Sequence, residues 1–296
     1  MRTFEAAVAS QHRYELAEGP IWDGPRDRVL WVDINAGHVY TGSLSGGVVT
    51  AVSALAFDET VGAVVCAADG TLLVAGRRGV YTVDADRRRM PGAQCVPEAK
   101  NSRLNDGACD PSGRFLVGSM ALDQRTREEC LYLLEPGAAP VIIDSDLTLS
   151  NGLAWSPDGC VLYSVDTEAM VVWSRRYETS GPTWGERREA IRLTDGFPDG
   201  MCIDTNGNLW VAIWGAGQVR CYAPTGDWLA TVTVPAPNTS SAAFVGPRLD
   251  TLLITTATED LSAAQLTKYP LSGHLFTANV EAIGAPTTPW RQARWT

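Results

Sequence analysis

A polar residue followed by glycine recurs along this sequence at a spacing of roughly 45 residues, a period typical of a propeller blade. The pairs are Glu18-Gly19, Asp106-Gly107, Asn151-Gly152 and Asp199-Gly200, with an apolar copy at Val61-Gly62 and a degenerate copy near Ser240-Ser241. If the repeats close around an axis, their side-chain oxygens converge at one end of it. Glu18, Asn151 and Asp199 then offer two carboxylates and an amide oxygen, a hard ligand set suited to Ca²⁺, Mg²⁺ or Mn²⁺, with Zn²⁺ possible.

The same pairs have an alternative interpretation without chemistry. Asp-Gly and Asn-Gly are common turn pairs and could simply lead the chain into a strand. Glu18 weakens this alternative, because glutamate is a poor turn former. The sequence offers few residues for a centre built on histidine, since His12, His38 and His274 all lie away from the polar-glycine pairs. A Ser-His-Asp triad or a zinc-trihistidine centre is therefore disfavoured.

The elements around each pair indicate how it is positioned. A turn rich in Asp, Pro, Asn and Gly follows, as in Asp110-Pro111-Ser112-Gly113, and then a β-rich run, as in Phe115-Leu116-Val117. Further short strands complete about four per unit, and six units fill the chain. We therefore predict an all-β fold, a six-bladed β-propeller with four strands per blade, forming a single domain over residues 1–296.

Two segments outside this pattern carry their own expectations. The stretch around Phe4 to Leu16 is expected to pair with the final blade and cover its edges, because open strand edges favour aggregation. No long amphipathic helix is visible, and the best helical segment, Ser262 to Leu266, spans a turn or two.

Composition restricts the partners. The formal net charge of −10 argues against nucleic acid and anionic membranes, since both require clustered Lys and Arg. The N-terminus lacks the apolar segment of a signal peptide, and no later stretch approaches a membrane span. Seven cysteines without a CxxC pair lie mostly in apolar runs, as expected for buried, reduced thiols. We expect a cytoplasmic protein that is a monomer or a weak homo-oligomer.

Four segments resemble the SMP-30/gluconolactonase family, which includes bacterial sugar lactonases. They are LAEGPIWD, RLNDGACDPSGRFLVGSM, SNGLAWSPDG and PDGMCIDTNGNLWVAIWG, and the resemblance runs from about Glu15 to beyond Phe276. It implies a six-bladed propeller with one catalytic divalent metal near the top of the central channel. The implied metal ligands are Glu18, Asn151 and Asp199, and Asp199 is also the implied general base.

The resemblance implies substrate contacts as well. Arg103 and Asn105 match the family's polar contacts, although from the residues alone Arg103 could be a surface charge-pair residue and Asn105 a turn residue. Asp123 stands where the family has a glutamate, so this implied acidic contact would reach less far. Asp106 is expected to accept a hydrogen bond within an inner loop instead of binding the metal.

The function implied is metal-dependent hydrolysis of a small-molecule sugar lactone to the aldonic acid, with one divalent ion acting as a Lewis acid. Two alternatives stay open. One is a propeller that binds a divalent metal such as Ca²⁺ without catalysis, and the other is a related esterase or phosphotriesterase on the same fold. Arg103 and Asn105 favour the lactonase, because they suit hydroxyl groups and a pure metal binder needs no polar substrate wall.

Overall fold

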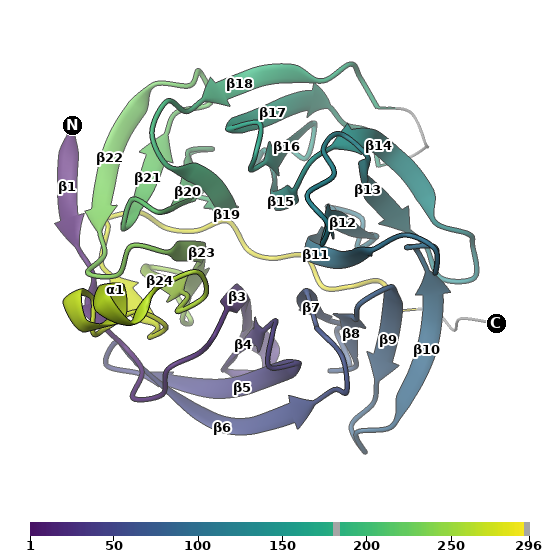
Figure 1. Ribbon diagram of the computed structural model, residues 1–296, viewed down its shortest axis with the longest axis horizontal. Coiled ribbons are helices and arrows are strands. Elements are labelled where there is room, and N and C mark those ends of the chain that lie inside the picture. Colours follow the sequence, from purple (N-terminus) through teal and green to yellow (C-terminus); the bar gives the residue numbers. More distant parts are fainter. Residues whose placement is uncertain (180–183, 293–296) are drawn as a thin grey trace.

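Turns containing glycine join the first two strands of each repeat into a hairpin. In the computed structural model, which describes residues 1–179 and 184–292, Gly113, Gly159 and Gly207 adopt φ values of 81°, 72° and 83° in these turns. Such positive φ values are available to glycine at no steric cost. The hairpins extend into six sheets arranged around a central axis (Figure 1). The predicted all-β, six-bladed propeller is confirmed.

The strands of the six blades are given from the axis outward. Blades 1 and 2 contain β3 (Ala17–Asp23), β4 (Arg28–Asp33), β5 (His38–Ser45), β6 (Val48–Ala56), and β7 (Ala63–Cys66), β8 (Leu72–Ala75), β9 (Gly79–Val83), β10 (Arg89–Gln94). Blades 3 and 4 contain β11 (Ser102–Cys109), β12 (Phe115–Ala121), β13 (Glu129–Leu134), β14 (Val141–Leu147), and β15 (Ser150–Trp155), β16 (Val161–Asp166), β17 (Val171–Arg176), β18 (Arg188–Arg192). Blades 5 and 6 contain β19 (Phe197–Ile203), β20 (Leu209–Trp214), β21 (Gln218–Tyr222), β22 (Trp228–Thr233), and β23 (Thr239–Val245), β24 (Thr251–Thr256), β25 (Phe276–Ala278).

The N-terminal residues pair with two blades, which corrects the prediction that they pair with the final blade alone. β2 (Ala7–Val8) lies antiparallel to β25 and completes blade 6 with a fourth strand. β1 (Arg2–Glu5) lies parallel to β22 and adds a fifth strand to blade 5. The extended segment spans the junction between the two blades, so it satisfies the open backbone groups of both outer edges.

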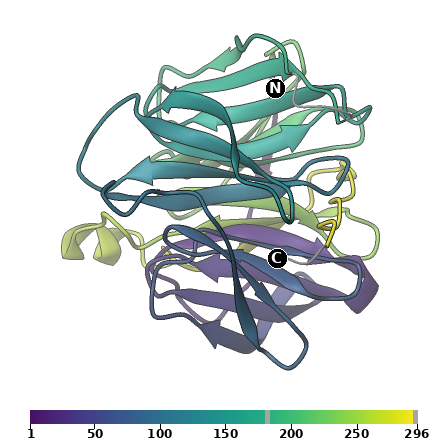
Figure 2. The same cartoon turned by 90° about the vertical axis from the view of Figure 1, so that its right-hand side faces the viewer.

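The two ends of the axis are covered differently. At one end the C-terminal segment crosses beneath the blades: Ile283 O accepts from Thr205 N at 2.8 Å, and Arg291 N donates to Gly113 O at 2.7 Å. At the other end lies the loop after β24, which carries α1 (Ala263–Lys268). Figure 2 shows α1 and the yellow C-terminal segment on opposite sides of the molecule. The predicted short helix is confirmed, and its first turn is capped by the Ser262 side chain.

The polar-glycine pairs fall on bulges of the inner strands. The register between first and second strands shifts after Glu18 in β3, after Leu104 in β11, after Asn151 in β15 and after Pro198 in β19. β7, which follows the apolar pair Val61-Gly62, keeps a regular register with β8. A bulge re-aims the side chains on the bulged strand, so these irregularities turn polar groups out of the blade plane.

The glycines of these pairs allow neighbouring inner strands to approach closely. A Cβ atom added at Gly152 would lie 2.6 Å from the carbonyl oxygen of Asp199 in the next blade. A Cβ atom at Gly62 would lie 2.5 Å from the carbonyl oxygen of Asn105. Both distances are shorter than any tolerated contact. Close packing of the inner strands therefore explains the repeated glycine. It does not explain the polar residue that precedes the glycine.

All seven cysteines, which lie within the described parts of the chain, are free thiols. Cys66, Cys130 and Cys221 are buried, as expected, but Cys160 is exposed. Cys160 lies at the end of the hairpin turn before β16, where the chain projects from the blade, and this explains the departure from the predicted burial. Among residues 1–179 and 184–292, no helix combines the length and the apolar character needed to cross a membrane.

Candidate metal and substrate site

Five of the six predicted site residues are buried on four inner strands around the axis. Glu18 on β3, Arg103 and Asn105 on β11, Asn151 on β15 and Asp199 on β19 are each 5% exposed. The Asn105 side-chain amide donates to the carbonyl of Ser150 at 3.0 Å, which ties β11 to β15 beside Asn151. The structure thus brings together residues up to 181 positions apart, at the end of the axis opposite the C-terminal segment.

At this site burial and neighbouring negative charges disfavour the ionised forms of the acids Glu18, Asp106 and Asp199. Burial, followed by the charge of Asp106, raises the pKa of Glu18. Burial, followed by Glu18 and Asp106, raises the pKa of Asp199 well above its usual value. Burial also raises the pKa of Asp106 to about 6. Carboxylates that share a desolvated site resist carrying charge together, and a cation between them reverses that preference.

Two oxygens of the group have the character expected of metal ligands. Asn151 Oδ1 and Asp199 Oδ1 are buried and accept no hydrogen bond from any described residue. Orphaned buried oxygens are costly, and a bound cation is one way to compensate them. No three His, Cys, Asp or Glu side chains in the described ranges form a metal-holding group on their own. The predicted ligand set contains two carboxylates, so it depends on the amide of Asn151 and fits a hard divalent cation.

Arg103 is a buried cation without a salt bridge to any described residue. Its guanidinium donates to Asn105 Oδ1 at 2.5 Å and to the Leu104 carbonyl at 3.1 Å. Burial lowers the pKa of Arg103 to about 10, against the opposing charges of Glu259, Glu18 and Asp199, so the side chain stays protonated at neutral pH. Burial also excludes the alternative in which Arg103 is a surface charge-pair residue.

Asn105 and Asp106 are both engaged with the protein. Asn105 lies within the β11 bulge and not in a turn, and both ends of its amide are hydrogen-bonded, one to Arg103 and one to the Ser150 carbonyl. Asp106 Oδ1 accepts from the Gly107 amide at 2.7 Å, which confirms the predicted hydrogen-bond acceptor.

Asp123 is not part of the buried group. It follows β12, its side chain is 39% exposed, and its carboxylate pairs with Arg125 at 2.7 Å. The structure therefore places this residue on the surface, and its contact with a substrate stays a prediction.

Two residues near the site were not found by sequence reasoning. Glu259, half-buried in the loop after β24, accepts from the Asn35 side chain at 2.7 Å and acts electrostatically on Arg103, Glu18 and Asp199. Its one signal in the sequence is its place within the region, from about Glu15 to beyond Phe276, that resembles the family. Thr167, which follows β16, accepts from the Asn151 side-chain amide at 3.1 Å. Nothing local in the sequence marks Thr167.

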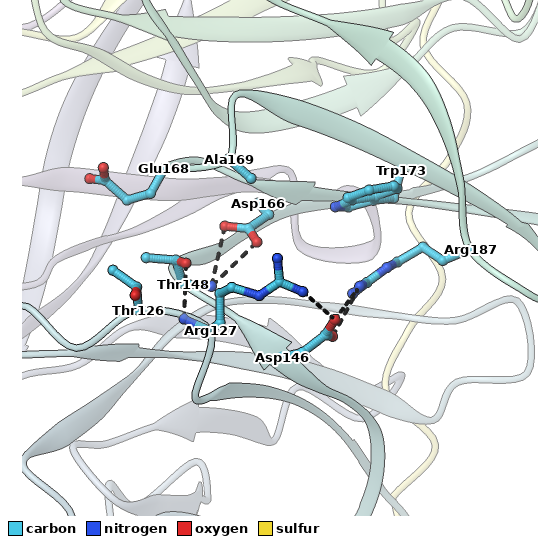
Figure 3. Close-up of a pocket in the computed structure, with 9 residues that line it drawn as sticks. All are labelled: Thr126, Arg127, Asp146, Thr148, Asp166, Glu168, Ala169, Trp173 and Arg187. Carbon is cyan, nitrogen blue, oxygen red and sulfur yellow. Dashed lines mark hydrogen bonds and ion pairs between the residues drawn. The ribbon is translucent and has the colours of Figure 1, made fainter.

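A surface cavity of about 430 Å³ lies between blades 3 and 4 (Figure 3). Its lining residues are Thr126, Arg127, Asp146, Thr148, Asp166, Glu168, Ala169, Trp173 and Arg187, and none of the predicted site residues is among them. Arg187 pairs with Asp146 at 2.8 Å and lies over the Trp173 ring at 4.7 Å. The cavity is a groove between these blades in which Arg187 and Asp146 pair with each other.

Fold and site together define a six-bladed β-propeller with a buried, oxygen-rich site at one end of its axis. The chain belongs to the SMP-30/gluconolactonase/LRE-like family, whose family model matches residues 16–258. It is 33% identical to regucalcin of Danio rerio, over 98% of both chains. It is also 33% identical to pentonolactonase XacC of Haloferax volcanii, over 92% of this chain and 93% of that one. A solved structure described as a calcium-binding protein, regucalcin, from Agrobacterium tumefaciens superposes with a TM-score of 0.91 at 27% identity, over 98% of this chain and 99% of that chain.

Proposed function

We propose that this protein is a lactonase that hydrolyses a sugar lactone to the aldonic acid, using one divalent metal ion, Ca²⁺, Mg²⁺, Mn²⁺ or Zn²⁺. The observation that carries the proposal is the pair of buried oxygens, Asn151 Oδ1 and Asp199 Oδ1, that no described residue hydrogen-bonds, next to the buried cation Arg103. The 33% identity to a protein named as a pentonolactonase supports it.

Glu18, Asn151 and Asp199 are the residues proposed to hold the metal. When bound, a divalent ion polarises a lactone carbonyl and lowers the pKa of an attacking water. The charge of such an ion also accounts for the concentration of acids at the site, because it favours their ionised forms against the cost of burial.

The other steps fall to side chains of this chain. Asp199 is the proposed general base: it takes a proton from water as the water oxygen bonds to the carbonyl carbon. The ring C–O bond then breaks, and that proton passes to the departing ring oxygen. Arg103, held by Asn105, donates hydrogen bonds to the hydroxyl groups or the ring ester of the lactone. Asp123 would meet the substrate only at the rim, because its side chain is exposed.

A propeller that binds Ca²⁺ without catalysis is the second candidate. The similarity to a structure described as a calcium-binding protein favours it. The buried Arg103, which forms no salt bridge with a described residue, opposes it, since a guanidinium beside a metal site weakens cation binding and helps only if an anionic or polar substrate is also bound. A related esterase or phosphotriesterase is the third candidate and shares the metal site.

A substrate screen separates the three candidates. Protein stripped by a chelator would be assayed with a pH indicator on pentono- and hexonolactones, an aryl ester and a phosphotriester, before and after adding Mn²⁺, Mg²⁺, Zn²⁺ or Ca²⁺. We expect hydrolysis of at least one lactone only after metal addition. Full turnover by metal-free protein would refute the metal dependence, and cation binding without turnover of any substrate would favour the non-catalytic propeller.

We further propose that residues 1–296 act as one domain in the cytoplasm, as a monomer or a weak homo-oligomer. The seven free thiols of the described chain support a reducing compartment.

A further inference from the structure

The three proposed ligands differ in one chemical respect. Glu18 and Asp199 are carboxylates, which present an oxygen to a cation whichever way they turn. Asn151 carries an amide, and a half-turn about its last bond replaces the oxygen by an NH₂ group, a donor that repels a cation. The amide ligand therefore needs its nitrogen end held away from the cation, and the carboxylate ligands have no such end.

Thr167 is the partner of the nitrogen end. The Nδ2 atom of Asn151 donates to Thr167 Oγ1 at 3.1 Å, while Oδ1 is buried and accepts from no described residue. Thr167 is itself 6% exposed, and its backbone N–H donates to the Leu149 carbonyl at 3.0 Å. Its hydroxyl is thus held in place on the nitrogen side of the amide.

Blade 1 contains the same corner without the hydroxyl. Asp33 accepts from Leu16 N at 3.0 Å, and the next residue, Ile34, donates its N–H to Leu16 O at 3.0 Å. In blade 4 Asp166 accepts from Leu149 N at 3.2 Å, and the next residue is Thr167. The proposed ligand follows two residues after the leucine in both blades, Glu18 in blade 1 and Asn151 in blade 4.

The matched corners isolate what the hydroxyl does. Backbone and aspartate contacts are alike, so Thr167 is not needed to build the corner. In blade 4, where the proposed ligand is the Asn151 amide, the corner residue is Thr167. In blade 1, where the proposed ligand is the Glu18 carboxylate, the corner residue is the apolar Ile34.

We propose that Thr167 is a positioning residue that fixes the Asn151 amide with Oδ1 directed to the metal. The inference rests on the proposed metal site, and not on which substrate is hydrolysed. Removing the hydroxyl leaves the Nδ2 end of the amide without this partner, and loss of such an outer contact typically lowers metal affinity by about 10- to 100-fold.

The test is a double-mutant cycle read by calorimetric titration of the metal-stripped protein with Mn²⁺. Thr167→Val keeps the shape and removes the hydroxyl, and Thr167→Ser keeps the hydroxyl. We expect Thr167→Val to weaken Mn²⁺ binding by about tenfold or more, and Thr167→Ser to retain most of the affinity. In an Asn151→Ala background, where residue 151 has no amide for Thr167 to hold, Thr167→Val should cost about threefold or less.

Thr82→Val is the matched control, since Thr82 is also buried, its hydroxyl has no partner among the described residues, and it lies on β9 in blade 2. This variant should bind Mn²⁺ as the wild type does, and melting temperatures of all variants should be recorded.

Three outcomes overturn the inference. Wild-type affinity in Thr167→Val overturns the role of Thr167 and leaves the proposed function intact. Equal losses from Thr167→Val in the wild-type and Asn151→Ala backgrounds show that Thr167 acts on packing and not on the amide. No Mn²⁺ binding by the wild type removes the proposed metal site and the inference together.

Discussion

Two groups of buried acids lie at opposite ends of the propeller axis and differ in how their oxygens are paired. At the end crossed by the C-terminal segment, Asp110 accepts from Arg114 Nε at 2.7 Å and from the Tyr177 hydroxyl at 2.9 Å. Asp204 accepts from Asn208 Nδ2 at 2.9 Å and from Trp210 Nε1 at 3.1 Å. At the other end Asp199 Oδ1 has no described partner.

Burial is nearly the same in the two groups, so burial alone does not identify a functional acid. Asp110 is fully buried and Asp199 is 5% exposed. A buried carboxylate whose oxygens are all hydrogen-bonded stabilises the fold locally, here by shaping a hairpin turn. A buried carboxylate left without a partner costs stability and persists where function requires it. The comparison therefore assigns a structural role to the acids at one end of the axis and supports the proposed chemistry at the other.

The largest effect is expected at Asp199. Asp199→Asn should lower the lactonase rate by about 100- to 10,000-fold, the usual contribution of a general base, while the melting temperature stays the same or rises because a buried charge is removed. Steady-state kinetics with metal content measured alongside checks this. A variant that keeps its metal and loses less than about tenfold in rate would show that Asp199 is only a ligand.

The opposite pattern is expected at Asp110. Asp110→Asn should destabilise the fold by about 3 kcal/mol, because it leaves Arg114, 4% exposed, without its main partner. The lactonase activity of the folded variant should be unchanged. Urea denaturation and kcat/KM measure the two effects. A loss of activity without a loss of stability would contradict the structural role assigned to Asp110.

A smaller functional effect is expected at Arg103. Arg103→Ala should lower kcat/KM by about 1.5–3 kcal/mol, the range of a charge-assisted hydrogen bond, with metal affinity equal or higher because a nearby positive charge is lost. Kinetics on each accepted lactone and titration with Mn²⁺ test both parts. Unchanged kinetics on every lactone would remove Arg103 from the substrate site.

The smallest effect is expected at Asp123. Asp123→Asn should change kcat/KM by about twofold, or roughly 0.5 kcal/mol, because the side chain is exposed and already paired with Arg125. The same lactone assay, with Arg103→Ala as reference, measures it. A loss as large as that of Arg103→Ala would mean that the loop after β12 approaches the bound substrate.

Sequence and structure agree most closely on the repeats. The turn after each polar-glycine pair needs glycine or proline at particular positions. The β-rich run that follows each turn favours a strand through its own residues, whatever its distant contacts are. Strand positions such as Phe115–Ala121 and Leu209–Trp214 could be predicted for this reason. The spacing of the polar-glycine pairs indicated Glu18, Asn151 and Asp199 as candidate ligands, and the resemblance to the family implied the same set. The structure brings the strands that carry them together at one end of the axis.

The features that could be predicted from the residues were therefore local: hairpins, the blade period, and the types of side chain available for chemistry. Two other features depend on the folded molecule, namely how the N-terminal residues divide between β1 and β2, and which buried oxygens remain without partners. Thr167 and Asn151 are 16 residues apart, and no local preference makes one accept from the other. Such pairings depend on bulges and on the packing of inner strands, which arise only when the blades close around the axis.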